Sequence, residues 1–505
     1  MKRFSVHART IAALVIALAA ALSLSAHVGS PDVYYEGDAG PYHLFVTVRV
    51  PQVIPGVAEI QIRCATKDVR AIQIVPMRLS GPGSNYPPTP DLAEQSKEDP
   101  QFFAGSLWLM EDGALKVRVS VDGAKGQGEL SVPVAAAAQK TLKMERPLGG
   151  LLALLMVFLA MGIVFIAGAA VREGSLGPGE TPAPGRVRRA RVVMAIAAVV
   201  VVGILYLGRT WWNSDANNYQ RGVNFFKPPA AETKLENGNR LMIRAKGQDA
   251  EWSNYVKMEK VIPDHGHLMH LFVFSVPGLD RIWHLHPDRI AGGAFAQELP
   301  SMPAGRYQIF ADIVDKDGFP WTLVGSVALT QINGKALAGD DSAWSGTAVT
   351  TQLDDFGVSQ LADGGRMIWQ RGKDPLKANV PMNFKFAVED KDGQPAKDLE
   401  PYMGMAGHAE FVSTDMSVFA HVHPAGSVSM AALGLARPGP ANAASGELQA
   451  GIALSMPMSM PMSSAPMPSE VSFPYGFPRT GNYRIVVQIK RAGRVETGVF
   501  DAHVQ

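Results

Sequence analysis

Short runs of alternating apolar and polar residues recur through three stretches of the chain. In residues 42–50, Leu44, Val46 and Val48 alternate with polar or mixed residues, as expected of a strand with one buried face. Similar runs punctuated by Gly and Pro continue through residues 27–143, and again through residues 235–335 and 366–505. A polar stretch at 336–365 is expected to be a linker. The pattern predicts a mainly β protein with three immunoglobulin-like β-sandwich domains.

Two longer apolar runs do not alternate. Residues 148–171 carry no charged side chain over a length sufficient to cross a bilayer as a helix, and residues 192–208 are apolar up to the Trp211–Trp212 pair. The arginine-rich stretch 172–191 between them predicts a cytoplasmic loop, because basic loops stay on the cytoplasmic side. We therefore expect a two-helix transmembrane hairpin whose flanking regions face outward.

The N-terminus has the organisation of a secretory signal. Basic residues precede a short apolar run, and cleavage after Ala26 would leave His27 as the first residue of the mature chain. Its α-amino group and imidazole could then chelate one copper ion together. The alternative is that His27 simply lies near a frayed end. Residues 1–26 are predicted to be a signal peptide, and export through it agrees with the orientation inferred from the arginines.

A histidine pattern occurs twice. "RIWHLHP" (281–287) and "VFAHVHP" (418–424) each contain His-x-His-Pro, and each follows another histidine by 14 or 13 residues. Downstream, "AGRYQIFADI" (304–313) matches "TGNYRIVVQI" (480–489). We interpret this as a tandem duplication. Eight of the 12 histidines fall in residues 264–287 and 408–423, which is not typical of scattered surface histidines.

Two histidines at i and i+2 of a strand point to the same face, so they can meet one metal ion. They could also be surface residues on the exposed face of a sheet. The principal candidate ligands are His270, His284, His286, His408, His421 and His423. Weaker candidates are His27, His265, His267, Met403, Met405, Met456, Met458, Met460 and Met462.

Most of these weaker methionine candidates lie in an insertion at residues 425–470. Its "SMPMSMPMSSAPMP" segment cannot form a helix and has little to bury, so packing does not explain its methionines. Thioether sulfur is a soft ligand that selects Cu(I), whereas imidazole suits Cu(II), zinc and nickel. The combination favours copper in both oxidation states, with zinc as the alternative metal. The segment could instead be a low-complexity linker.

Composition excludes several classes. The formal net charge of +1 indicates no nucleic-acid partner. A single cysteine, Cys64, excludes an intrachain disulfide framework and a cysteine-rich zinc site, and it argues against a blue-copper centre.

The segments "DHGHLMHLFVFSVPGLDRIWHLHP" and "GMAGHAEFVSTDMSVFAHVHP" resemble a signature of bacterial exported, membrane-associated proteins linked to copper and heavy-metal handling. The resemblance implies metal-associated periplasmic β domains with ligands at the six principal histidines. It leaves open which histidine completes the first site, because His265 and His267 are additional there.

These observations together predict a copper-binding protein anchored in the bacterial inner membrane, with most of the chain in the periplasm. Its role would be copper storage, delivery or resistance, and its partners a copper transporter, chaperone or cuproenzyme. The alternatives are a three-histidine metalloenzyme and an assembly module without metal. No general base or substrate pocket is evident, so an enzyme is the less favoured reading.

Overall fold

A computed structural model describes residues 27–28, 32–246, 258–350, 357–437 and 467–505, and it is mainly β, as predicted, with 46% strand and 19% helix. The predicted signal peptide and most of the Met-rich insertion lie outside the described residues. The chain forms two compact units, one of residues 1–137 and 228–505 and the other of residues 138–227. The immunoglobulin-like character of the predicted domains stays a prediction.

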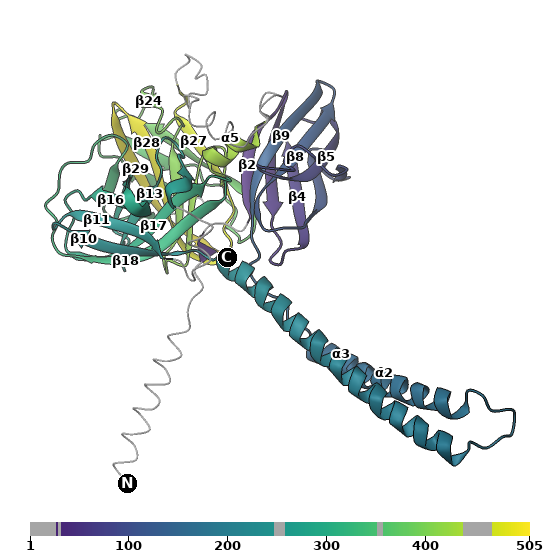
Figure 1. The fold of residues 1–505 in the computed structure, drawn as a ribbon. Coiled ribbons are helices and arrows are strands. Elements are labelled where there is room, and N and C mark those ends of the chain that lie inside the picture. Colours follow the sequence, from purple (N-terminus) through teal and green to yellow (C-terminus); the bar gives the residue numbers. More distant parts are fainter. Residues whose placement is uncertain (1–26, 29–31, 247–257, 351–356, 438–466) are drawn as a thin grey trace, which may run out of the picture. The chain divides into compact units, whose positions relative to one another are not determined.

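The N-terminal strands form an eight-stranded sheet in the order β2-β3-β4-β7-β6-β5-β8-β9 (Figure 1). Alternation explains the strands, since Leu44, Val46 and Val48 of β3 are fully buried while His43 is exposed and Phe45 and Arg49 are half-buried; Thr47 alone departs from the alternation, being buried as well. The lone Cys64 is buried at the end of β4. The strands are β2 (Val33–Ala39), β3 (Tyr42–Arg49), β4 (Gly56–Cys64), β5 (Val69–Arg78), β6 (Asp91–Gln95), β7 (Phe102–Leu109), β8 (Gly113–Gly123) and β9 (Gly126–Ala136).

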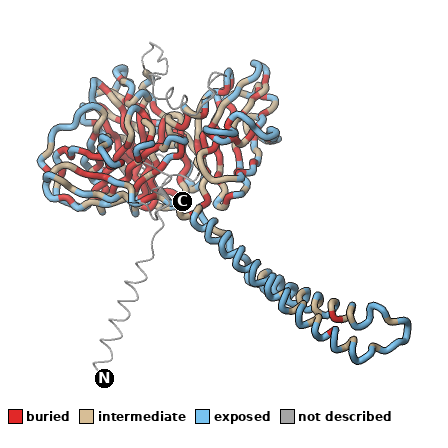
Figure 2. The backbone as a smooth tube through the Cα atoms, in the orientation of Figure 1, coloured by how far each residue is buried: buried red, intermediate tan, exposed pale blue. Residues whose placement is uncertain are grey.

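The second unit is helical. Helix α2 spans Arg146–Glu173 and helix α3 spans Pro184–Phe225; both are long and apolar enough to cross a membrane. Figure 2 shows them exposed along most of their length, which in water would leave a large apolar surface uncovered. The stretch expected as a loop at 172–191 is partly helical, because α3 already begins at Pro184 and includes four of the arginines.

Strands β10 to β19 build a ten-stranded sheet that carries the first histidine pattern. Its strands are β10 (Ala230–Glu236), β11 (Arg240–Lys246), β12 (Val261–Ile262), β13 (His270–Val276), β14 (Arg281–Leu285), β15 (Asp288–Ile290), β16 (Ala294–Glu298), β17 (Gly305–Asp315), β18 (Pro320–Leu329) and β19 (Ser342–Ser345).

A seven-stranded and a four-stranded sheet contain the C-terminal strands and the second histidine pattern. The seven-stranded sheet consists of β1 (His27–Val28), β20 (Val349–Thr350), β24 (Leu399–Glu400), β25 (His408–Ser413), β26 (Val418–Val422), β28 (Gly481–Arg491) and β29 (Arg494–Val504). The four-stranded sheet consists of β21 (Gly357–Gln360), β22 (Arg366–Trp369), β23 (Met382–Glu389) and β27 (Glu470–Tyr475).

The duplication inferred from the sequence has a structural counterpart. We call residues 264–329 the first repeat and residues 402–504 the second repeat. The strand order β14-β13-β17-β18 of the first repeat matches the order β26-β25-β28-β29 of the second. The register matches as well: His270 pairs with Asp312 where His408 pairs with Gln488, and Phe272 pairs with His284 where Glu410 pairs with His421.

The two repeats share a core. Phe272 and Phe310 of the first repeat pack against Phe419 of the second, and the Phe310 and Phe419 rings stack with centroids 4.4 Å apart. Burying each such ring stabilises the fold by about 1.5–3 kcal/mol. This aromatic layer holds the histidine-bearing strands of the two repeats face to face.

Two segments differ from the sequence-based expectation. The stretch 336–365, expected to be a linker, contributes strand β19, which pairs with β14, and strand β21. The beginning of the insertion at 425–470 is ordered: helix α5 spans Met430–Ala436, and Ser429 caps it by accepting a hydrogen bond from the Ala432 amide. In both segments backbone N–H and C=O groups form the hydrogen bonds of a strand or a helix, and polar composition alone does not predict these elements.

Candidate metal centre

Eight histidines meet where the paired strands of the two repeats end. His270 and His408 are the first residues of β13 and β25, and the two His-x-His pairs lie at the adjoining ends of β14 and β26. Within each pair the rings are 4.6 Å apart, between His284 and His286 and between His421 and His423, as residues two apart on one strand face require. The complete set is His265, His267, His270, His284, His286, His408, His421 and His423.

Each repeat enters its first histidine strand through the same tight turn. In Asp264–His267 and in Tyr402–Met405 the outer residues exchange backbone hydrogen bonds, and both central residues have positive φ. Such turns resemble type I′ and normally favour Gly or Asn. His265 (φ 51°) and Met403 (φ 50°) occupy the strained position of the two turns, so the fold places them equivalently.

One group of potential ligands lies within the first repeat. His270, His284 and His286 offer nitrogen atoms that all lie within 4.8 Å of one another. His270 Nδ1 is 3.2 Å from His284 Nε2. This is the trio that the sequence pattern singled out in the first repeat.

The other ring nitrogen of each of these three histidines faces a hydrogen-bond acceptor. The acceptors are the Asp264 carbonyl at 3.0 Å from His270 Nε2, Gln488 Oε1 at 2.9 Å from His284 Nδ1 and Asp341 Oδ1 at 2.9 Å from His286 Nδ1. An imidazole that donates through one nitrogen presents a lone pair at the other. Three lone pairs therefore converge, and His286 Nε2 is buried without a hydrogen-bond partner among the described residues. Metal-bound histidines are oriented in this way.

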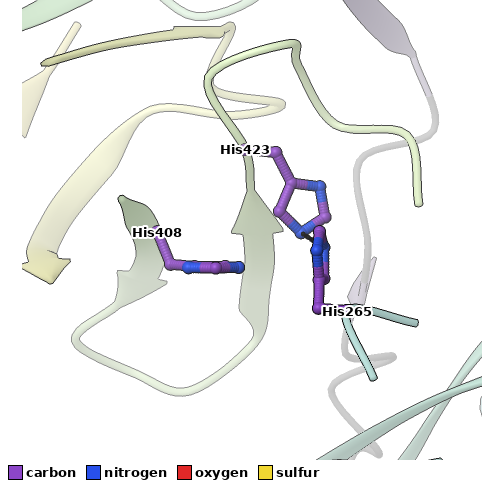
Figure 3. Close-up of side chains that lie close together, drawn as sticks. All are labelled: His265, His408 and His423. Atoms are coloured by element: carbon purple, nitrogen blue, oxygen red, sulfur yellow. Dashed lines mark hydrogen bonds between the residues drawn. The ribbon is translucent and has the colours of Figure 1, made fainter. Parts of the chain in front are cut away.

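A second group draws its ligands from both repeats. His265 of the first repeat joins His408 and His423 of the second, again with ligand atoms within 4.8 Å of one another. Figure 3 shows the three rings, with His265 Nε2 3.0 Å from His423 Nε2. His423 Nδ1 lies 2.9 Å from the Val428 carbonyl, which leaves its Nε2 as the free lone pair. Both ring nitrogens of His408 are buried without a partner among the described residues.

His421 does not belong to either three-residue group. Its Nδ1 is 3.4 Å from Asp312 Oδ2, and its buried Nε2 has no partner within the described chain. The sequence pattern placed His421 with His408 and His423; in the fold, His265 from the other repeat takes that place.

Burial sets the charge of the centre. It lowers the pKa of His265 and His284 to about 3 and that of His423 to about 4, and it lowers the pKa of His270, His286, His408 and His421 well below the usual value. These imidazoles are neutral at pH 7 and offer their lone pairs without competition from protons.

Carboxyl groups line the same interior. Burial raises the pKa of Asp312 to about 7 and of Asp341 to about 6. Burial, with Asp312 nearby, also raises the pKa of Glu410 well above its usual value, and both Glu410 carboxyl oxygens lack a hydrogen-bond partner among the described residues. A cation bound nearby would favour the charged form of these groups.

The weaker candidates lie in varied positions. His267 stacks on His286 with centroids 3.9 Å apart and lies 3.4 Å from Asp340 Oδ2. Met403 contributes its backbone carbonyl as a hydrogen-bond acceptor for the His265 ring, and Met405 closes the equivalent turn. The backbone of His27 pairs with β26 at Val418. Met456, Met458, Met460 and Met462 lie outside the described residues.

Sequence reasoning did not identify the residues that orient the histidines. Asp340 and Asp341 belong to the expected linker, and Gln488 lies in the matched segment 480–489. A signal was present: Asp312 and Gln488 are aligned polar residues that interrupt the apolar runs 309–314 and 485–489. Each lies beside a histidine of the other repeat, Asp312 beside His421 and Gln488 beside His284.

Fold and site together define a mainly β chain with two apolar helices that could span a membrane and with histidine groups that could hold a metal. The model of a family described as a domain of unknown function, DUF8832, matches residues 360–505, the part that includes the second repeat. No curated protein matches the chain.

Solved structures show only distant similarity. An engineered protein is 14% identical over 18% of this chain, with a TM-score of 0.15. Latent PorU from Porphyromonas gingivalis is 8% identical over 94% of the chain (TM-score 0.14), and E. coli alpha-2-macroglobulin in its native conformation is 8% identical over 95% (TM-score 0.20). The chain spans 20%, 34% and 23% of these three structures, respectively.

Proposed function

We propose that this protein binds copper on the periplasmic side of a bacterial inner membrane, for storage, delivery or resistance. The observation that carries the proposal is the orientation of the first group. His270, His284 and His286 each direct one nitrogen at a hydrogen-bond acceptor, which leaves three lone pairs facing one another. Lone pairs repel unless a cation lies between them, so the arrangement is suited to a metal ion.

The ligand chemistry favours copper over zinc. The only cysteine, Cys64, is buried in the N-terminal sheet, so the histidine groups contain no thiolate. Imidazole binds both oxidation states of copper, and the chain carries a methionine-rich segment, residues 456–467, whose thioethers suit Cu(I). Zinc is the alternative that the same histidines would accept.

Membrane anchoring follows from the two apolar helices, and the periplasmic assignment follows from the arginines. The arginines cluster at the N-terminal end of α3, next to the loop that joins the two helices. The β regions are attached to the opposite ends, one before α2 and the other after α3. Binding is favoured over catalysis because a substrate would have to reach ring nitrogens that are buried, with His284 and His408 0% exposed.

The experiment is a metal titration of the full chain purified in detergent. We expect the histidine groups to bind about two Cu(I) per chain in competition with a chromophoric chelator, one for each three-histidine group, counted apart from Cu(I) on the methionine-rich segment. Replacing His284 and His286 together should remove one equivalent, and replacing His408 and His423 together should remove the other. His503→Ala, at an exposed histidine outside the centre, is the matched control.

Copper binding that the paired substitutions do not change would contradict the proposal. If the chain bound Zn(II) as tightly as Cu(I), or more tightly, the site would be assigned to zinc and not to copper.

A further inference from the structure

The two histidine groups are not separated from each other. Between the groups, the His265 and His270 rings are 5.7 Å apart and the His284 and His408 rings are 6.3 Å apart. Within the groups, the ring centroids are 5.4 Å apart for His270 and His284 and 4.9 Å apart for His265 and His408. Spacing between the groups is therefore nearly the same as spacing within them, and the imidazoles form one continuous cluster.

His421 lies between the two groups. Its ring centroid is 5.4 Å from that of His270 and 6.0 Å from that of His284, both in the first group. It is somewhat closer to the second group, at 5.3 Å from His408 and 4.6 Å from His423. Its Nε2 is buried without a partner among the described residues, so a lone pair remains between the two possible metal positions.

Two carboxyl groups, which a bound cation would hold in the charged form, lie at the same place. Glu410 is the cross-strand partner of His421, so the two side chains lie on the same face of the sheet, and Glu410 is 1% exposed with no partner for either carboxyl oxygen among the described residues. Asp312 approaches His421 from the other repeat at 3.4 Å. Two cations in one buried space repel each other, and neutral imidazoles do not offset that repulsion, whereas these carboxylates do.

We propose that the two histidine groups form a single dinuclear centre, which binds a pair of copper ions with His421 between them and with Glu410 and Asp312 supplying negative charge. A metal lies about 2 Å from each ligating nitrogen, so the two ions would be on the order of 4–8 Å apart. This inference rests on the proposed function, and it adds that the two ions are bound in contact with shared residues rather than at independent sites.

Electron paramagnetic resonance of the detergent-solubilised full chain, loaded stepwise with Cu(II), tests the distance directly. At one equivalent a mononuclear spectrum is expected. The second equivalent should broaden that spectrum by dipolar coupling and produce a half-field transition, because two unpaired spins so close together interact strongly.

Variants assign the two positions. His286→Ala and His265→Ala should each bind one equivalent and show only the mononuclear spectrum, whereas His503→Ala should retain the coupled spectrum. Glu410→Gln preserves size but removes the charge; it should weaken the second equivalent at least tenfold while leaving the first unchanged.

The outcomes separate the two proposals. Two bound ions with two uncoupled mononuclear spectra would overturn the dinuclear centre and leave the proposed function standing. A chain that binds no copper at these histidines would overturn the proposed function itself. If Glu410→Gln bound the second copper equivalent with unchanged affinity, the charge-compensating role of Glu410 would be wrong.

Discussion

The two repeats place histidines at matching strand positions but surround them differently. In the first repeat, Phe272 stacks on His284 with centroids 4.2 Å apart, whereas the matching position of the second repeat is Glu410, opposite His421. His270 faces the Asp264 carbonyl at 3.0 Å, whereas both nitrogens of its counterpart His408 have no partner among the described residues. The first repeat therefore presents a preoriented set of ligands, whereas the second combines an imidazole without a partner at either nitrogen, His408, with the buried acid Glu410.

This difference suggests a division of labour after duplication. A hydrogen-bonded histidine is held in one tautomer and one orientation, which favours tight binding of one ion. An unpaired histidine beside a carboxyl group is costly to bury unless a cation compensates it. The second repeat should consequently depend more strongly on metal for its stability than the first. Three predictions test this comparison.

The largest effect concerns acid. Seven imidazoles of the centre have lowered pKa values, so below about pH 6.5 the unfolded chain binds protons that the metal-free native state does not. Each contributes a fall of up to ~1.4 kcal/mol per pH unit in the free energy of unfolding. Four carboxyl groups that line the centre oppose this, because their raised pKa values keep them protonated in the native state at pH values above about 4.5, where the unfolded chain has lost those protons; they are Asp264, Asp312, Asp341 and Glu410.

Since the seven imidazoles of the centre outnumber its four carboxyl groups, the centre should make the metal-free protein lose stability as the pH falls from about 6.5 towards 4. Denaturant unfolding of the chelator-treated chain at several pH values measures this, with copper-loaded protein as the comparison. Glu410→Gln removes one opposing group of the second repeat and should steepen the loss. Stability that is independent of pH over this range would contradict the neutral, buried state of the histidines.

A smaller effect concerns the contacts that cross between repeats. Gln488 of the second repeat accepts the hydrogen bond of His284 in the first. Gln488→Leu should weaken metal binding by the first group about 10–100-fold, the usual cost of losing such an orienting contact, while leaving the second group nearly unchanged. Competition titration of the two equivalents measures it, and Gln360→Leu, at an exposed glutamine of β21, is the matched control. If only the second group lost metal affinity, Gln488 would have to be assigned to the second group and not to the first.

The smallest effect compares equivalent histidines in the absence of metal. His270→Leu removes one of the two hydrogen bonds to the Asp264 carbonyl, which keeps the bond from the His267 amide, whereas His408→Leu removes an imidazole that has no partner among the described residues. The two variants should therefore differ by about 0.5–1.5 kcal/mol in their free energy of unfolding, the net value of one hydrogen bond, with His408→Leu the more stable. Chemical unfolding in the presence of a chelator decides this. Equal stability of the two variants would remove the distinction between the repeats.

Much of the local structure follows from the sequence. The alternation in residues 42–50 predicts strand β3, and the two apolar runs predict helices α2 and α3, although α3 extends further at both ends. The His-x-His spacing predicts that His284 and His286 share a face, and their nitrogens do belong to one group. These successes depend on a period of two along a strand and on apolar length, both of which are local properties.

Which histidine completes each group was decided by tertiary structure. His265 lies in the first repeat but joins His408 and His423 because the two sheets pack through Phe272, Phe310 and Phe419. Contacts such as His284 with Gln488, and His286 with Asp341, join residues 204 and 55 positions apart. The side-chain period along one strand determines which residues share a face, but it carries no information about which strand of another sheet lies opposite. That choice depends on how the aromatic faces of the two repeats bury each other, and so the ligand sets exist only in the folded chain.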